Sequence, residues 1–116
     1  MLQLKSTKNP YMLVLAPTRE LAKQIADVCT EVGEAVGLKT LVVFGGTDKQ
    51  PQKSALKKGV QILVATPGRL LDLCQEGCAS LADVKYFVLD EADRMLDMGF
   101  EKDIRAIAAM LKSKTQ

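Results

Sequence analysis

Three carboxylates stand within four residues near the end of the sequence, at Asp90, Glu91 and Asp93. They follow the apolar run Tyr86–Leu89, which has the composition of a strand, and precede a segment of helical pattern, Arg94–Phe100. In open parallel sheets, ligands bind beyond the carboxyl ends of the strands. Adjacent carboxylates there suit a hard divalent cation and a water molecule held for attack. The same acids could instead simply offset the dipole of the following helix.

Two earlier turns carry groups that suit a phosphate. In Thr66–Arg69, a hydroxyl stands at an expected N-cap, a proline takes the first helical position, and Gly68 lets another backbone approach. Free N–H groups at that helix start, with Arg69 beside them, would hold a phosphate. Thr18 and Arg19 open the longest expected helix in a similar way.

A third turn consists of Gly45 and Gly46, whose bare main chain an extended nucleic-acid strand could approach closely. Each of the three turns also has an ordinary explanation, because Thr-Pro often opens a helix, Gly-Gly often makes a turn, and a single arginine is usually solvated. Their shared position after apolar runs favours one anion-binding edge.

Four near-continuous apolar runs are typical of strands that are covered on both faces, as in parallel sheets. Segments of helical period lie between and after these runs, so strand and helix alternate throughout. Right-handed crossovers then predict an α/β fold in three layers, a parallel sheet flanked by helices. The four expected strands are Tyr11–Ala16, Thr40–Phe44, Val60–Ala65 and Tyr86–Leu89.

The first expected helix has one apolar stripe, which we expect to face the sheet. Further helices are expected at Asp48–Lys58 and Leu70–Gln75, and one continues from Phe100 toward the end of the chain. The two ends, up to Pro10 and from Lys112, have the composition of linkers. The stripe consists of Leu21, Ile25, Val28 and Val32.

Length and composition limit the possible functions. The 116 residues suffice for one small domain, and 47% hydrophobic residues can build a core. A net charge of +2 is too small to imply general polyanion binding, so any nucleic-acid contact must come from local placement. With three scattered cysteines and no histidine, a zinc site and a histidine-based triad are disfavoured, and reduced thiols are expected. No apolar run approaches membrane-spanning length, so no membrane partner is expected.

Four motifs, in this order and spacing, resemble motifs Ia, GG, Ib and II of the DEAD-box ATP-dependent RNA helicases. The resemblance extends from about Tyr11 to Phe100, and four motifs in register make it specific. The motifs are Pro17-Thr18-Arg19-Glu20-Leu21-Ala22, Gly45-Gly46, Thr66-Pro67-Gly68-Arg69-Leu70 and Asp90-Glu91-Ala92-Asp93.

The resemblance implies a RecA-like domain of the P-loop NTPase superfamily, with ATP and Mg²⁺ as cofactors. Asp90 would help to hold Mg²⁺ through water, Glu91 would activate the attacking water, and Asp93 would couple the nucleotide site to the next motif. Asp90 and Glu91 would thus be catalytic, and all three acids would bind the cofactor. A second set of residues would grip the sugar–phosphate backbone of single-stranded RNA without reading its bases. By resemblance, this set is Pro17, Thr18, Arg19, Gly45, Gly46, Thr66, Pro67, Gly68 and Arg69.

Two elements that the family uses for ATP turnover do not occur in the sequence: the Gly-x-x-x-x-Gly-Lys-Ser/Thr loop and the Ser-Ala-Thr motif. We therefore expect residues 1–116 to be the middle of the first RecA-like domain, an incomplete domain without the second one. Alone, it should not hydrolyse ATP. The missing strands would lie beside Tyr86–Leu89, so their removal would expose an apolar sheet edge.

Three other functions need a test. A non-catalytic RNA-binding or scaffold module would keep the turns without nucleotide chemistry, and a Mg²⁺–ATP titration would distinguish it. A receiver-like phosphate acceptor needs an acidic pair near its first strand, whereas the acids here follow the last one. A metal-dependent hydrolase is disfavoured because no histidine or second carboxylate cluster completes a site.

The segments Cys74-Gln75-Glu76-Gly77 and Asp93–Phe100 resemble helicases that assist ribosome assembly in the nucleolus. On this resemblance, ribosome-assembly factors are expected partners. We expect an intracellular protein of the nucleus, nucleolus or cytoplasm, with the nucleolus favoured.

Overall fold

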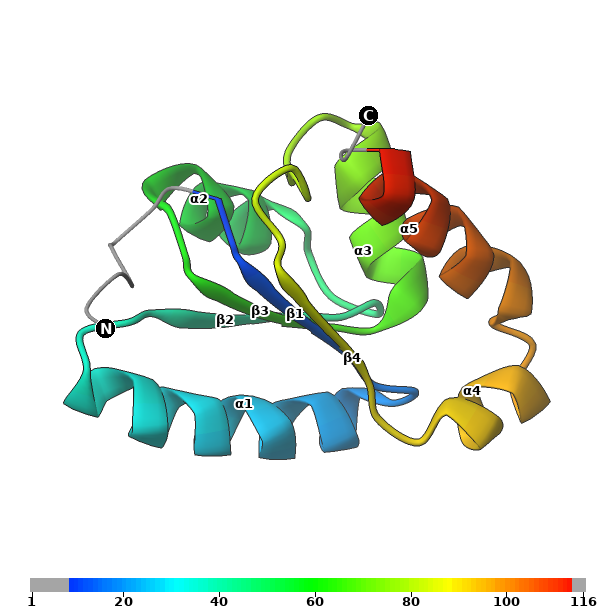
Figure 1. The fold of residues 1–116 in the computed structure, drawn as a ribbon, viewed down its shortest axis with the longest axis horizontal. Helices are drawn as coiled ribbons and strands as arrows, with labels where there is room; N and C mark the ends of the chain where they lie inside the picture. Colours follow the sequence, from blue (N-terminus) through cyan, green and yellow to red (C-terminus); the bar gives the residue numbers. More distant parts are fainter. Residues whose placement is uncertain (1–8, 114–116) are drawn as a thin grey trace.

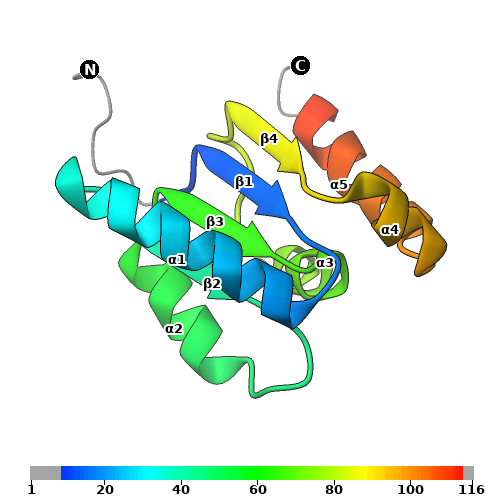
Figure 2. The same cartoon turned by 90° about the horizontal axis from the view of Figure 1, so that it is seen from below.

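A four-stranded parallel sheet forms the centre of the computed structural model, which describes residues 9–113. The strand order is β2-β3-β1-β4 (Figures 1 and 2). All three strand pairs are parallel, so the predicted parallel sheet is confirmed. Each strand also lies within two residues of its predicted range. The strands are β1 (Met12–Leu15), β2 (Thr40–Val43), β3 (Ile62–Ala65) and β4 (Tyr86–Leu89).

Helices cover both faces of the sheet and give the predicted three layers. Helix α1 lies on one face, whereas α2, α3 and α5 lie on the other (Figure 1). α3 begins at Pro67, earlier than the apolar pattern suggested, because a proline at the first helical position needs no hydrogen-bonded N–H. The helices are α1 (Arg19–Ala35), α2 (Gln50–Lys58), α3 (Pro67–Gln75), α4 (Ala92–Asp97) and α5 (Glu101–Ser113).

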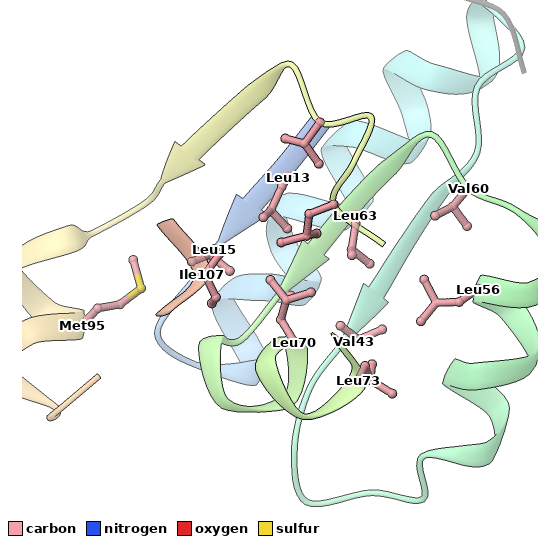
Figure 3. Close-up of a cluster of buried hydrophobic side chains, with 13 residues drawn as sticks. Leu13, Leu15, Val43, Leu56, Val60, Leu63, Leu70, Leu73, Met95 and Ile107 are labelled. Atoms are coloured by element: carbon pink, nitrogen blue, oxygen red, sulfur yellow. The ribbon is translucent and has the colours of Figure 1, made fainter. Parts of the chain in front are cut away.

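The larger core cluster lies between the sheet and the helices α2, α3 and α5 (Figure 3). Leu13 and Leu63 are register partners on neighbouring strands, so their side chains project from the same face of the sheet. Leu70 and Leu73 of α3 and Ile107 of α5 are fully buried against this face. This packing holds the start of α3 against the carboxyl end of β3.

The smaller cluster lies under α1, and it confirms half of the predicted apolar stripe of that helix: Leu21 and Ile25 pack against it, whereas the other two stripe residues are exposed. α1 buries the small residues Ala22 and Ala26 in this cluster, whereas Val28 and Val32 are 63% and 65% exposed. Gly33 is buried against the turn that follows the helix, where a Cβ atom would lie only 3.1 Å from the carbonyl oxygen of Leu38. Alanines therefore face the sheet, and the larger valines lie to the side.

β4 departs from the prediction of a strand covered on both faces. β1 and β3 are buried along almost their whole length, but Tyr86, Val88 and Leu89 of β4 are exposed. Among the described strands, β4 pairs with β1 alone and lies at the edge of the sheet. An exposed apolar edge was expected from the resemblance, and this strand has one.

The linker prediction is wrong at both ends where the structure describes them. Pro10 is almost completely buried, and Lys112 belongs to α5. The outermost residues, 1–8 and 114–116, lie outside the described part. Within the described part, none of the helices has both the length and the apolar character needed to cross a bilayer.

Candidate functional site

The segments that follow the four strands all emerge at the carboxyl end of the sheet, at the right of Figure 1, because the four strands are parallel. A cleft of about 410 Å³ lies there, with walls from the segments after β1, β2 and β3. It brings together six of the predicted RNA-binding residues, which lie up to 52 positions apart in the sequence. These are Pro17, Arg19, Gly45, Thr66, Gly68 and Arg69; Phe44, Asp72 and Phe100 complete the lining.

The turn after β1 is held by a helix cap. The Thr18 hydroxyl accepts a hydrogen bond from the backbone N–H of Leu21 at 3.2 Å, which satisfies one free donor at the start of α1. Thr18 thus caps the helix and does not line the cleft. The guanidinium carbon of Arg19 lies 5.7 Å from the ring centroid of Phe44, and Lys23 Nζ lies 5.3 Å from it. Two cations of α1 therefore gather over the residue that precedes Gly45.

The loop after β2 has the bare main chain that the sequence predicted. A Cβ atom built on Gly45 or on Gly46 would meet nothing within 4 Å, so both glycines face open space. Gly46 has φ +82°, a left-handed conformation that favours glycine. Gly45 lines the cleft, whereas Gly46 does not.

The turn after β3 starts α3. Thr66 occupies the predicted N-cap position, but its hydroxyl makes no capping hydrogen bond. Pro67 is buried behind it, and a Cβ atom on Gly68 would lie 3.8 Å from an Asp103 carboxylate oxygen. Arg69 donates from Nη1 to Gln52 Oε1 at 2.9 Å and from Nη2 to the Thr47 carbonyl at 3.0 Å. Its guanidinium is therefore tied to the neighbouring segment.

The acidic loop follows β4 and lies outside the cleft. The backbone N–H of Asp90 donates to the Leu15 carbonyl at 2.9 Å, so β1 holds the start of this loop. Glu91 takes the N-cap position of α4 in a left-handed conformation, with φ 55° and ψ 53°, and its carboxylate lies 3.4 Å from Arg94 Nη1. Asp93 is exposed in the first turn of α4. The three predicted acids are close in sequence, and because β4 pairs with β1, the start of their loop lies next to the end of β1.

A divalent cation would need ligands beyond these acids. Within residues 9–113, no group of three or more carboxylate, imidazole or thiol side chains is arranged to hold a metal ion. Mg²⁺ is commonly bound by one or two carboxylates together with substrate phosphates and water. Asp90, which is half-buried directly after β4, can supply one such oxygen, so the donor set fits Mg²⁺ that arrives with a nucleotide.

The sequence motifs did not indicate several residues that contribute to this region. Phe44 and Phe100 add apolar walls to the cleft, and Asp72 adds a carboxylate. Gln52 lies behind the loop and is 8% exposed, as a polar residue within the packed face of α2. Its position one helical turn before the buried Leu56 was the available signal, because buried amides require partners.

Ion pairs fix α2 against α3 behind the cleft. Lys49 Nζ lies 2.8 Å from Asp72 and also pairs with Glu76, and Lys53 Nζ lies 2.6 Å from Glu76. Hydrogen bonds from Lys49 and then from Lys53 lower the pKa of Glu76 to about 2. These lysines therefore hold the scaffold together.

The cysteines take no part in the site. All three are free and partly buried. Burial raises the pKa of Cys74 to about 11, which makes its thiol a poor nucleophile at neutral pH.

Comparison with known proteins points to one family. The model of the DEAD/DEAH box helicase family matches residues 1–116. The DEAD-box ATP-dependent RNA helicase 5 of Oryza sativa subsp. japonica is 55% identical over 114 residues, which are 97% of this chain and 22% of the relative. The protein of the same name from Arabidopsis thaliana is 59% identical over 99 residues, which are 85% of this chain and 18% of the relative. The chain thus spans about a fifth of the length of these relatives.

A solved structure gives the same result for the fold. The yeast DEAD-box splicing factor Prp28 is similar with a TM-score of 0.86 and 36% sequence identity, over 90% of this chain and 24% of the Prp28 chain. The predicted RecA-like α/β fold is therefore confirmed.

Proposed function

Because the chain belongs to the DEAD/DEAH box helicase family, we propose that the protein is an ATP-dependent RNA helicase that unwinds RNA duplexes or remodels RNA–protein complexes. The proposal concerns the whole protein, since the chain spans about a fifth of its relatives. One structural observation supports it above the others. Turns from three strands, each with a cationic side chain, an open main chain or a helix start, converge on a single cleft.

We assign this cleft to the sugar–phosphate backbone of one RNA strand. Arg19 and Arg69 supply positive charge, Gly45 and Gly46 leave the main chain accessible, and the helix that begins after Thr66 directs its first N–H groups to this side. Phosphate contacts position a nucleic acid but carry no sequence information. The cleft should therefore bind RNA of any sequence.

We assign the acidic loop to ATP and Mg²⁺. Asp90 would hold Mg²⁺ through water, Glu91 would accept a proton from the attacking water, and Asp93 would link this loop to the rest of the nucleotide site. Mg²⁺, when bound, neutralises charge on the phosphates and lowers the barrier to phosphoryl transfer. Asp90 directly follows the carboxyl end of β4, which pairs with β1, and ligands of open parallel sheets bind beyond the carboxyl ends of the strands. This position supports the assignment.

A salt titration of RNA binding tests the RNA assignment. Fluorescence anisotropy of a labelled oligouridine and a labelled oligoadenine should give similar affinities for the chain. Arg19→Gln should make the plot of the logarithm of the RNA association constant against the logarithm of the salt concentration shallower. Its slope should change by about 0.7, as expected for one lost phosphate contact on a single strand. Arg105→Gln is the matched control, because Arg105 is exposed on α5 and pairs with Glu101 outside the cleft. The assignment fails if both variants weaken binding equally or if the chain does not bind at low salt.

The 116 residues alone should not turn over ATP, because they contain no phosphate-binding loop of the Gly-x-x-x-x-Gly-Lys-Ser/Thr type. Phosphate release should stay at background with Mg²⁺–ATP and RNA together. RNA-stimulated release would contradict this expectation. Binding of RNA by the whole protein without binding of Mg²⁺–ATP would instead favour the alternative function, a non-catalytic RNA-binding or scaffold module.

A role in ribosome assembly in the nucleolus rests on the sequence resemblance of Cys74–Gly77 and Asp93–Phe100 alone. If it holds, the full-length protein should co-sediment with pre-ribosomal particles. Sedimentation only with other RNA–protein complexes would exclude this role.

A further inference from the structure

Gln52 lies at the centre of a hydrogen-bond network that joins two of the turns of the cleft. Its amide nitrogen donates to the Phe44 carbonyl at 3.2 Å and to the Thr47 hydroxyl at 3.3 Å. Its amide oxygen accepts from Arg69 Nη1 at 2.9 Å. Phe44 precedes Gly45 and Thr47 follows Gly46, so one side chain holds the glycine loop on both sides.

This network restrains a loop that its two glycines would otherwise make flexible. Two adjacent glycines have the greatest backbone freedom of any dipeptide, so an unsupported Gly45–Gly46 loop would lose much entropy when it bound a ligand. A Cβ atom on either glycine would meet nothing within 4 Å, so the packing of these two residues does not restrain the loop. The two ends of the loop are held by the donors of the Gln52 amide and by Arg69, which donates to the Thr47 carbonyl.

The network also places Arg69. A guanidinium has five N–H donors, so its bonds to Gln52 and to the Thr47 carbonyl do not exhaust it. These bonds draw Arg69 toward the glycine loop while it lines the cleft. Gln52 itself is not among the residues that line the cleft and is almost completely buried.

We propose that Gln52 is a positioning residue for RNA binding, which fixes the Gly45–Gly46 loop and Arg69 in one arrangement before RNA arrives. The inference rests on the proposed function of the cleft. It adds a residue that lies outside the four motifs and is not expected to touch RNA.

The test uses Gln52→Met, which keeps the length of the side chain and its burial but removes all three hydrogen bonds. RNA affinity of the chain should fall roughly fivefold to tenfold, since a network of this size contributes about as much as one or two hydrogen bonds. Gln50→Met is the matched control, because Gln50 is an exposed residue of the same helix. Its affinity should equal that of the wild type.

A double-mutant cycle separates positioning from general destabilisation. If Gln52 acts partly through Arg69, Gln52→Met should cost clearly less affinity in an Arg69→Met background than in the wild type. Additive effects would overturn this part of the proposal. Gln52→Glu keeps an acceptor for Arg69 but cannot donate to Phe44 and Thr47, so it should not restore wild-type affinity.

Backbone order parameters from NMR relaxation supply a readout that does not depend on RNA. The order parameters of the Gly45, Gly46 and Thr47 amides should fall in Gln52→Met, while that of Leu63 in the central strand stays unchanged. Unchanged order parameters in the loop would overturn the proposal, as would an unchanged RNA affinity of Gln52→Met when the wild type binds RNA. If the wild-type chain binds no RNA, the proposed function fails, and the role of Gln52 in RNA binding fails with it.

Discussion

At the residue scale, Glu91 stands out because it alone among the non-glycine residues of 9–113 has a positive φ. A left-handed conformation costs a residue with a Cβ atom roughly 1–2 kcal/mol. Such strain is retained only where the surrounding structure enforces it, and it is common at functional sites. Here the backbone turns sharply from β4 into α4, and this turn brings the carboxylate to the loop that we assign to ATP.

This strain predicts an unusual order of stability for two substitutions. The free energy of unfolding of the Glu91→Gly variant should be about 1 kcal/mol higher than that of Glu91→Ala, because only glycine accepts φ +55° without strain. Chemical denaturation followed by circular dichroism measures the difference. Glu31, which is exposed within α1, gives the control, since alanine should there be the more stable by up to about 1 kcal/mol. The same order at both positions would show that Glu91 is not strained.

At the element scale, the contact between α2 and α3 depends on charge. Glu76 follows the last residue of α3 and pairs with Lys49 and Lys53, so two cations from the α2 segment meet one carboxylate. Gln52 lies on the same helix as Lys53, so this contact also supports the network behind the cleft.

The lowered pKa of Glu76 predicts a dependence of stability on pH. The folded pKa of about 2 lies below the ordinary value of 4.5, so the contribution of Glu76 is fully present above about pH 5 and is lost as the pH falls toward 2. Glu76→Gln should therefore be less stable than the wild type at pH 7, and the difference should shrink across this window. Urea denaturation at several pH values measures it, with Glu31→Gln as the control. A constant difference across the window would show that the ion pairs do not stabilise the fold.

At the scale of the whole molecule, the α1 side of the sheet is incompletely covered. Val14 packs under α1, and its register partner Val88 projects from the same face but is 42% exposed. Tyr86 is exposed beside it, and Val28 and Val32 are exposed on α1. An apolar edge strand with free backbone groups is a surface that pairs readily with another chain.

We expect this edge to make the 116-residue chain self-associate. Val88→Lys should raise the dissociation constant of the self-associated form at least about tenfold, because two copies pairing through β4 would bring like charges together. Sedimentation velocity over a range of concentrations measures the change. Ala108→Lys, at an exposed position of α5, adds the same charge elsewhere and should have no effect. Equal effects of both variants would indicate that net charge, and not the edge, controls association.

Local patterns in the sequence predicted the four strands, their parallel arrangement and the position of every motif at a strand end. They could do so because apolar runs, helical periods and turn residues act over a few neighbouring positions. The acidic loop after Tyr86–Leu89 and the turn at Thr66–Arg69 lie where these local signals put them. The same motifs predicted the family, and the match of the family model over residues 1–116 confirms it.

Which surfaces meet could be learned only from the folded chain. It selected Ala22 and Ala26 of α1 for the sheet in preference to Val28 and Val32, since the distance between backbones determines which side chains fit. It also joined Arg69 to Gln52, 17 positions away, and gave Glu91 its left-handed conformation. Such contacts depend on packing between segments that are distant in the chain, and no local pattern records that packing.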